Sequence, residues 1–173
     1  MREGVFEEGG NVTIQGHLEE IRDLGGLKFL ILRDIKGRVQ VVFNKKTAAR
    51  QLLDLVDSTS RESVVKVVGR VKKDDRAPMG FEIEPTSFEV ISKAESPLPI
   101  DIVGKTETNL DTRLDWRFLD LRKPEVAAIF KIQSKLGKAI REFFDKKGFY
   151  EIHTSKIVSQ ATEGGANVFP IFY

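Results

Sequence analysis

The sequence predicts an all-β barrel that is followed by the start of an α+β domain. Residues 11–92 contain five stretches with the alternation of apolar and polar side chains that is typical of strands, with one helical stretch before the fourth. Residues 124–148 have instead the longer period of an amphipathic helix. We therefore divide the chain into a barrel at 1–96, a linker at 97–123 and an α+β segment at 124–173.

The first strand is expected near residues 11–22. Val12, Ile14 and Leu18 fall on one face of it. The alternation changes phase at Glu20, which predicts a β-bulge. The glycine pair in "DLGG" is then typical of a turn.

The second and third strands are expected over residues 27–33 and 38–44, with a tight turn in "DIKG" between them. Leu30 and Leu32 define the inward face of the second strand. On the third strand, Phe43 and the valines two and four residues before it define that face. Both strands therefore present a second set of side chains outward.

A short helix is predicted at 47–56, a fourth strand at 62–72, and a fifth strand at 80–94 that is interrupted at Pro85. Three strands, a helix and two strands is the chain order of the OB-fold, a small Greek-key barrel that binds oligonucleotides. The pattern alone does not separate the OB-fold from other small barrels.

The linker has two prolines in three residues and no sustained period, so we expect local structure with solvated charges. The helix after it begins at Pro124, where a missing N–H costs little, and Gly148 is its expected C-cap. A strand, a glycine-rich loop and another strand should follow. Because an apolar strand at "VFPIFY" needs a sheet partner, we expect this second domain to be incomplete in this chain.

Composition excludes several classes of protein and site. Hydrophobic residues make up 40% and charged residues 31% of the 173 residues, as in globular proteins. There is no cysteine and only two histidines, so disulfides and a thiolate or histidine-rich metal site are not expected. The N-terminus has no secretory h-region and no run could span a bilayer, so we expect a cytoplasmic protein without a membrane partner. The net charge of +2 allows nucleic-acid binding only through a local basic surface.

One group of polar and aromatic side chains shares the predicted outer face of the first three strands. Phe29 and Gln40 lie on neighbouring strands, with Glu19 before the bulge and Arg22 after it. A ring can stack on a base, an amide can pair with a base edge, and a guanidinium can hold a phosphate. This arrangement predicts binding of single-stranded RNA. The alternative is that the linker or another domain simply covers Phe29.

Four segments, taken in order, resemble the archaeal/eukaryotic-type aspartyl-tRNA synthetases, which are class II enzymes. They are "GHLEEIRDLGGLKFLILRDIKGRVQVVF", "DTRLDWRFLDLRKPEVAAIFKIQS", "FFDKKGFYEIHTSKI" and "TEGGANVFPIFY". The resemblance implies an N-terminal anticodon-binding OB-fold and the first part of a catalytic domain with an antiparallel sheet. It implies that the full-length enzyme attaches L-aspartate to tRNA(Asp).

The resemblance also implies roles for single residues. Phe29 matches the phenylalanine that stacks on an anticodon base, Gln40 the glutamine that reads the central uridine, and Arg22 a basic residue beside them. Glu163, in "TEGGA", matches the glutamate that binds the ammonium group of aspartate, although "EGG" alone is typical of a surface turn.

In this family aspartate and ATP form an aspartyl-adenylate with the help of arginines and Mg²⁺, and tRNA then takes the aspartyl group. The motifs that bear the ATP-binding arginines lie beyond the match, so no catalytic residue is assigned here. We expect the 173-residue chain alone to be inactive in aspartate-dependent pyrophosphate exchange. The motif 1 helix and strand imply a homodimer, with Ser155 in place of the usual proline, although any amphipathic core helix has the same stripe.

Two positions bear on which tRNA is charged. Pro78 matches the proline of relaxed enzymes that also accept tRNA(Asn), whereas Glu19 matches neither type. We favour relaxed specificity, in which both tRNA(Asp) and tRNA(Asn) are charged. The alternative is that Pro78 is an ordinary loop proline with no role in the choice of tRNA. Two further readings stay open: a free-standing OB-fold protein that binds tRNA without catalysis, and a decayed paralogue that folds poorly.

Overall fold

The structure, a computed structural model, describes residues 7–77, 79–104, 106–155 and 157. The chain divides into two compact units, residues 1–126 and residues 127–173. The first unit holds a β-barrel and the segment after it, and the second holds most of a long helix.

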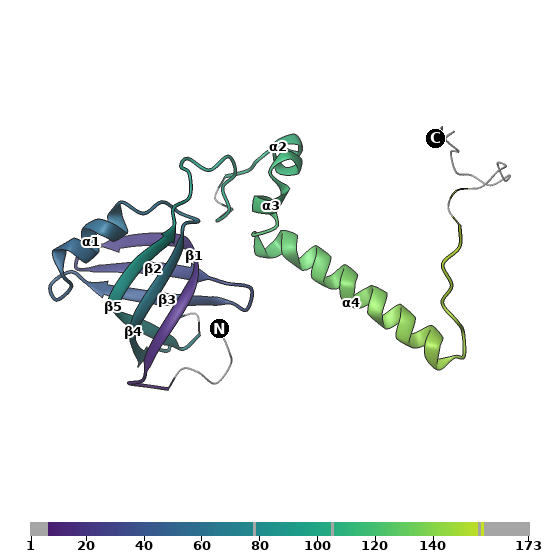
Figure 1. The fold of residues 1–173 in the computed structure, drawn as a ribbon, viewed down its shortest axis with the longest axis horizontal. Helices are drawn as coiled ribbons and strands as arrows, with labels where there is room; N and C mark the ends of the chain where they lie inside the picture. The colour runs from purple at the N-terminus through teal and green to yellow at the C-terminus, as the bar shows by residue number, and fades with distance from the viewer. Residues whose placement is uncertain (1–6, 78, 105, 156, 158–173) are drawn as a thin grey trace. The chain divides into compact units, whose positions relative to one another are not determined.

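Five strands close into a barrel in the order β1-β2-β3-β5-β4 (Figure 1). All neighbouring pairs are antiparallel except β3 and β5, which are parallel. A helix, α1, connects β3 to β4, so the chain order is the one the sequence predicts and the OB-fold is confirmed. The bounds are β1 (Asn11–Leu24), β2 (Leu27–Arg33), β3 (Arg38–Asn44), α1 (Arg50–Asp57), β4 (Val64–Lys73) and β5 (Phe81–Ser92).

The inward side chains of all five strands and two residues of α1 form one apolar core. Leu30, Leu32 and Phe43 are at most 1% exposed, as the alternation predicts. The ring of Phe43 meets that of Phe88 edge-on, with 6.2 Å between centroids. Burying each of these large side chains stabilises the barrel by about 1.5–3 kcal/mol.

The predicted bulge lies in β1, where the pairing with β2 shifts between Leu18 and Glu20. Leu18 is fully buried, and Glu20 pairs with Ile31. The extra residue, Glu19, lies close to the side chains of Arg33 and Arg38. The bulge therefore delivers two consecutive glutamates to the outer face of the barrel.

The interruption predicted at Pro85 is a register shift in the pairing of β4 with a continuous β5. Pro85 lies opposite Gly69 of β4. A Cβ on Gly69 would lie 2.4 Å from the carbonyl oxygen of Glu84, so only glycine allows the two strands to approach this closely.

The turn between β4 and β5 is held by Asp74. Its carboxylate accepts hydrogen bonds from the backbone N–H of Arg76 at 2.9 Å and from the Arg76 guanidinium at 2.9 and 3.1 Å. The guanidinium, followed by the backbone N–H, lowers the pKa of Asp74 to about 2.

We predict that the Asp74 carboxyl carbon titrates near pH 2 in an NMR pH series. Because the folded pKa lies below the ordinary 3.8, its small contribution to stability is present above pH 4 and is lost as the pH falls toward 2. Arg76→Ala should raise the pKa while leaving it below 3.8, because the backbone hydrogen bond stays. Titration near 3.8 in the unaltered chain would contradict this turn geometry.

The segment after the barrel is packed rather than merely solvated. Ile100, Ile102 and Leu119 are at most 6% exposed and form a second small core with Leu98. Two short helices, α2 (Leu110–Asp115) and α3 (Arg117–Asp120), follow. Buried Asp120 accepts hydrogen bonds from Arg113 at 3.1 and 3.2 Å and lies 3.3 Å from the Lys123 ammonium.

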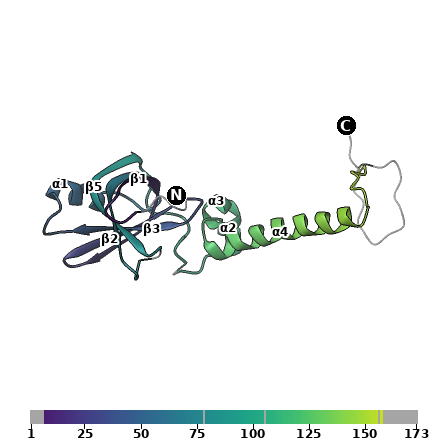
Figure 2. The same cartoon turned by 90° about the horizontal axis from the view of Figure 1, so that it is seen from below.

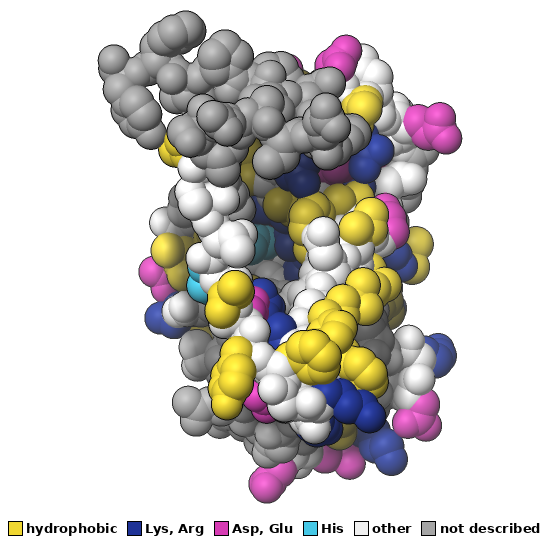
Figure 3. All heavy atoms as spheres, turned by 90° about the vertical axis from the view of Figure 1, so that its right-hand side faces the viewer, with side chains coloured by type: hydrophobic (Ala, Val, Ile, Leu, Met, Phe, Trp, Pro, Cys, Tyr) yellow, Lys and Arg dark blue, Asp and Glu magenta, His cyan; other side chains and the backbone are white. Residues whose placement is uncertain are grey.

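The long helix α4 (Pro124–Lys146; Figure 2) starts and ends as predicted. Gly148 takes the left-handed φ of +82° that suits a helix end. Its apolar stripe is exposed in this chain: Ile129, Ile132, Leu136, Ile140 and Phe143 are 49–67% accessible. Hydrophobic side chains accordingly gather on the face shown in Figure 3.

The strand predicted just after Gly148 does not form over residues 149–155. An isolated strand leaves its backbone groups unpaired, and no described segment pairs with this one. Ser155 is exposed, and its hydroxyl donates to the carbonyl of Ile157 at 2.6 Å.

Candidate nucleic-acid interface

Of the four residues predicted to share the outer face, Arg22, Phe29 and Gln40 lie in two adjacent rows. A row is a set of residues that pair directly across β1, β2 and β3. Arg22 pairs directly with Phe29, which pairs with Val42. In the next row Ile31 pairs with Gln40. Phe29 and Gln40 are therefore diagonal neighbours, close enough for one or two consecutive nucleotides to contact both.

Phe29 presents its ring outward. The residue is partly exposed, and it belongs to neither of the two apolar clusters. Within the described residues its ring contacts no other aromatic ring. A phenyl ring fixed on a rigid strand with a free face is a stacking surface for a base.

Gln40 offers both a donor and an acceptor at the same face. It is partly exposed, and across the described ranges its side-chain amide makes no hydrogen bond. On its other side it pairs with Glu82, whose carboxylate accepts from Lys72 at 3.0 Å. The amide is thus free to pair with the Watson–Crick edge of a base.

Arg22 contributes the positive charge. Its side chain is 60% exposed, and its guanidinium donates to the buried carboxylate of Glu20 at 2.5 Å. That hydrogen bond and the attraction between the two charges raise the pKa of Arg22 above its ordinary value. Because Glu20 pairs with Ile31, the contact directs a permanently charged guanidinium from the row of Phe29 toward the next row, which holds Gln40.

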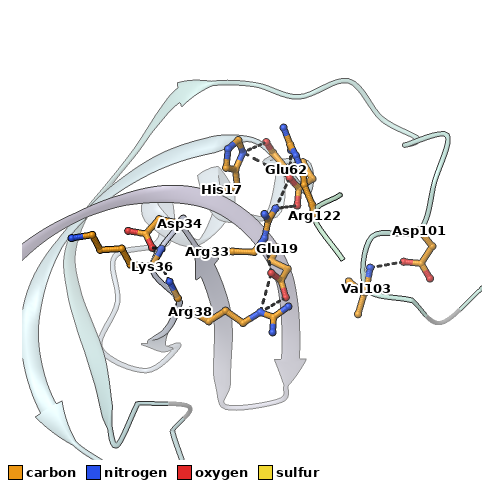
Figure 4. A network of polar contacts seen from close by, with 11 residues as sticks. His17, Glu19, Arg33, Asp34, Lys36, Arg38, Glu62, Asp101, Val103 and Arg122 are labelled. Carbon is orange, nitrogen blue, oxygen red and sulfur yellow. Dashed lines mark hydrogen bonds and ion pairs between the residues drawn. The ribbon is translucent and has the colours of Figure 1, made fainter. Parts of the chain in front are cut away.

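Glu19, the fourth predicted residue, has a different environment. Its side chain is 9% exposed, and its carboxylate lies 2.7 Å from Nε of Arg33 and 2.8 Å from Nε of Arg38 (Figure 4). Each oxygen of the Glu19 carboxylate forms an ion pair with an arginine of the same chain, so the charge of Glu19 is neutralised within the protein.

The sequence alone did not identify Glu62, which joins this face to the segment after the barrel. Arg33 donates to both of its carboxylate oxygens at 2.7 and 2.8 Å, and Arg122 donates to one of them. Nδ1 of His17 lies 3.3 Å from its carbonyl oxygen (Figure 4). No local pattern could reveal a contact between residues 60 positions apart.

Glu62 also has an uncommon backbone conformation. Its φ is +66°, a value that costs a non-glycine residue free energy. Its N–H donates to the carbonyl of Leu18 at 2.7 Å, while Ser63 accepts from the N–H of Leu18. The ion pairs and these backbone bonds together hold the strained conformation.

Two predicted residues, Pro78 and Glu163, lie outside the described residues. Among the residues that are described, no group of three or more histidine, aspartate or glutamate side chains could hold a metal ion. None of the described helices is both long and apolar enough to cross a membrane.

Family models match both parts of the chain. An OB-fold nucleic acid binding domain matches residues 12–91, and a model described as "tRNA synthetases class II (D, K and N)" matches residues 109–173. The first match covers every residue of the outer face discussed above, and the second begins within the packed segment after the barrel.

Curated proteins match nearly the whole chain. An aspartate–tRNA(Asp/Asn) ligase of Archaeoglobus fulgidus is 49% identical over 96% of this chain and 39% of its own length. An aspartate–tRNA(Asp) ligase of Pyrococcus abyssi is 50% identical over 95% of this chain and 38% of its own. The chain thus spans about two fifths of the length of these relatives.

Solved structures show the same relationship. An asparaginyl-tRNA synthetase of Pyrococcus horikoshii, complexed with asparaginyl-adenylate, superposes with a TM-score of 0.83 at 32% identity, over 96% of this chain and 38% of that one. An aspartyl-tRNA synthetase of Entamoeba histolytica gives 0.75 at 32% identity, over 89% and 38%.

Proposed function

The chain belongs to the aspartyl-tRNA synthetase family of class II ligases, and on that basis we propose that it supplies anticodon recognition to an aspartate–tRNA ligase. One observation carries the proposal: Arg22, Phe29 and Gln40 share the outer face of the barrel, with the amide of Gln40 unpaired among the described residues. These are the groups that hold a phosphate, stack on a base and read its edge.

For the whole enzyme we propose the two-step attachment of L-aspartate to tRNA(Asp), in the cytoplasm where tRNA is used. Glu163 is proposed to bind the ammonium group of aspartate, and α4 to take part in a homodimer interface. Class II synthetases use ATP and Mg²⁺. The described residues supply no site for a metal ion, so we assign no step of that chemistry to them.

We further propose that the enzyme also accepts tRNA(Asn). The motif that contains Pro78 supports this. Relatives of 49% and 51% identity are named for both tRNAs and relatives of 48% and 50% identity for tRNA(Asp) alone, so the names of the relatives allow either specificity. The carboxylate of Glu19 is ion-paired with Arg33 and Arg38. It is therefore not free to repel an anticodon base, which is consistent with acceptance of both tRNAs. A hairpin with the GUU anticodon should therefore bind within about threefold of one with GUC.

The proposal is tested by the binding of the 173-residue chain to RNA hairpins, measured by fluorescence anisotropy at a fixed salt concentration. We expect a hairpin with the GUC anticodon loop to bind about tenfold more tightly than one in which the central uridine is adenosine, because one base-edge hydrogen-bond pair is lost. Equal affinities would contradict anticodon reading.

Gln40→Ala should abolish this preference. We expect it to lower the affinity for the GUC hairpin to that for the substituted hairpin, and to leave the substituted hairpin itself bound as before. A variant that still prefers uridine would show that another residue reads the base. Gln15→Ala is the matched control, because Gln15 lies on β1 in the part of that strand that pairs with β4.

A further inference from the structure

A third row of side chains continues the outer face beyond Gln40. Arg33 of β2 pairs with Arg38 of β3, and Arg38 is two residues before Gln40 on the same strand and face. Two residues along a strand span about 6.7 Å. Arg38 therefore lies immediately beside the amide that we propose reads a base.

The ion pairs around Arg38 leave its outer end available. Its contacts with Glu19 are made through Nε, at 2.8 Å to one oxygen and 3.1 Å to the other. Within the described part of the chain, its terminal nitrogens donate to no acceptor. The side chain is 39% exposed, in contrast to 15% for Arg33. Glu19 thus holds the guanidinium in place at one edge (Figure 4), while the partly exposed side chain leaves the other edge accessible to solvent.

The charges of this cluster do not balance. Glu19 and Glu62 provide two negative charges, whereas Arg33, Arg38 and Arg122 provide three positive ones. Arg122 and the terminal nitrogen Nη2 of Arg33 bind the buried carboxylate of Glu62, while Nε of Arg33 lies 2.7 Å from Glu19. Arg38 is the most exposed arginine of the three, so the excess positive charge of the cluster is accessible to solvent mainly at Arg38.

We propose that Arg38 binds a phosphate of the anticodon loop, next to the nucleotide that contacts Gln40, and that Glu19 positions it. This inference rests on the proposed function and adds a backbone contact to it. A guanidinium whose Nε is already bonded presents its Nη groups in a fixed plane, which suits a phosphate oxygen. Because a phosphate carries no sequence information, the contact strengthens binding to all anticodon loops alike.

The test compares Arg38→Gln with the unaltered chain, using the GUC hairpin at several salt concentrations. We expect Arg38→Gln to weaken binding about tenfold at low salt, and equally for the hairpin with a substituted central base. The slope of log K against log salt should fall by about 0.7, the value for one phosphate contact on a single strand. Arg38→Lys should keep most of the slope, since it keeps the charge.

Arg50→Gln is the matched control, because it removes the same charge from an 88% exposed side chain on α1, outside this face. Equal affinities and slopes for Arg38→Gln and Arg50→Gln, with the unaltered chain still preferring the GUC hairpin, would overturn this inference and leave the proposed function standing. Failure of the unaltered chain to bind any hairpin would overturn both. Thermal unfolding of each variant verifies that the barrel is intact.

Discussion

Replacing Phe29 by alanine is expected to weaken the binding of the GUC anticodon hairpin about five- to 150-fold, since a stacked base contributes roughly 1–3 kcal/mol. The ring is partly exposed and lies outside both apolar clusters, so its removal should cost the barrel little stability. The loss should be the same at low and high salt, because stacking neutralises no phosphate. Fluorescence anisotropy with the 173-residue chain measures it.

Two variants make the Phe29 result specific. Phe29→Tyr keeps a ring in the same place and should retain most of the affinity. Phe118→Ala removes a ring of 58% exposure from α3 and should leave binding unchanged. If Phe29→Ala binds as tightly as the unaltered chain, the ring serves packing and the stacking role is wrong.

The second large effect is on folding rather than binding. Glu62→Gln should lower the free energy of unfolding by about 3–5 kcal/mol, because it leaves the guanidinium groups of Arg33 and Arg122 partly buried beside a neutral amide. Glutamine keeps the size of the side chain and the unfavourable φ, so the loss reports the charge of Glu62 and the hydrogen bonds that its carboxylate accepts. Urea unfolding followed by circular dichroism measures it.

Glu89→Gln is the control for that experiment. Its carboxylate is 61% exposed and lies 3.5 Å from the ammonium of Lys66, so the pair resembles other surface ion pairs. Such pairs contribute at most about 1 kcal/mol. Equal unfolding free energies for Glu62→Gln and Glu89→Gln would show that the buried cluster does not stabilise the first unit.

Local patterns were sufficient for the strands of the barrel, their order along the chain and the face that we propose binds RNA, although they did not separate the OB-fold from other small barrels. The alternation from Leu27 to Arg33 separates Leu30 and Leu32 from Phe29, and the change of phase at Glu20 locates the bulge. These features follow from the two-residue period of a strand, which any pairing partner must respect.

Contacts between distant residues could not be obtained in this way. Glu62 and Arg122 are 60 positions apart; Glu62 begins the predicted fourth strand, but the period of a strand does not reveal an ion pair with a residue of the irregular linker. The small core around Ile100 and Leu119 was missed for the same reason, since the segment has no regular period. The strand expected after Gly148 depends on a partner strand, which sequence alternation alone does not provide.

The central claim, that the outer face of β1–β3 receives the anticodon, is tested most directly by NMR of the chain bound to the GUC hairpin. We predict nuclear Overhauser contacts between the ring protons of Phe29 and the base protons of an anticodon nucleotide, with those base protons shifted upfield by the ring. Contacts confined to other parts of the chain, with Phe29 and Gln40 unperturbed on binding, would contradict the claim.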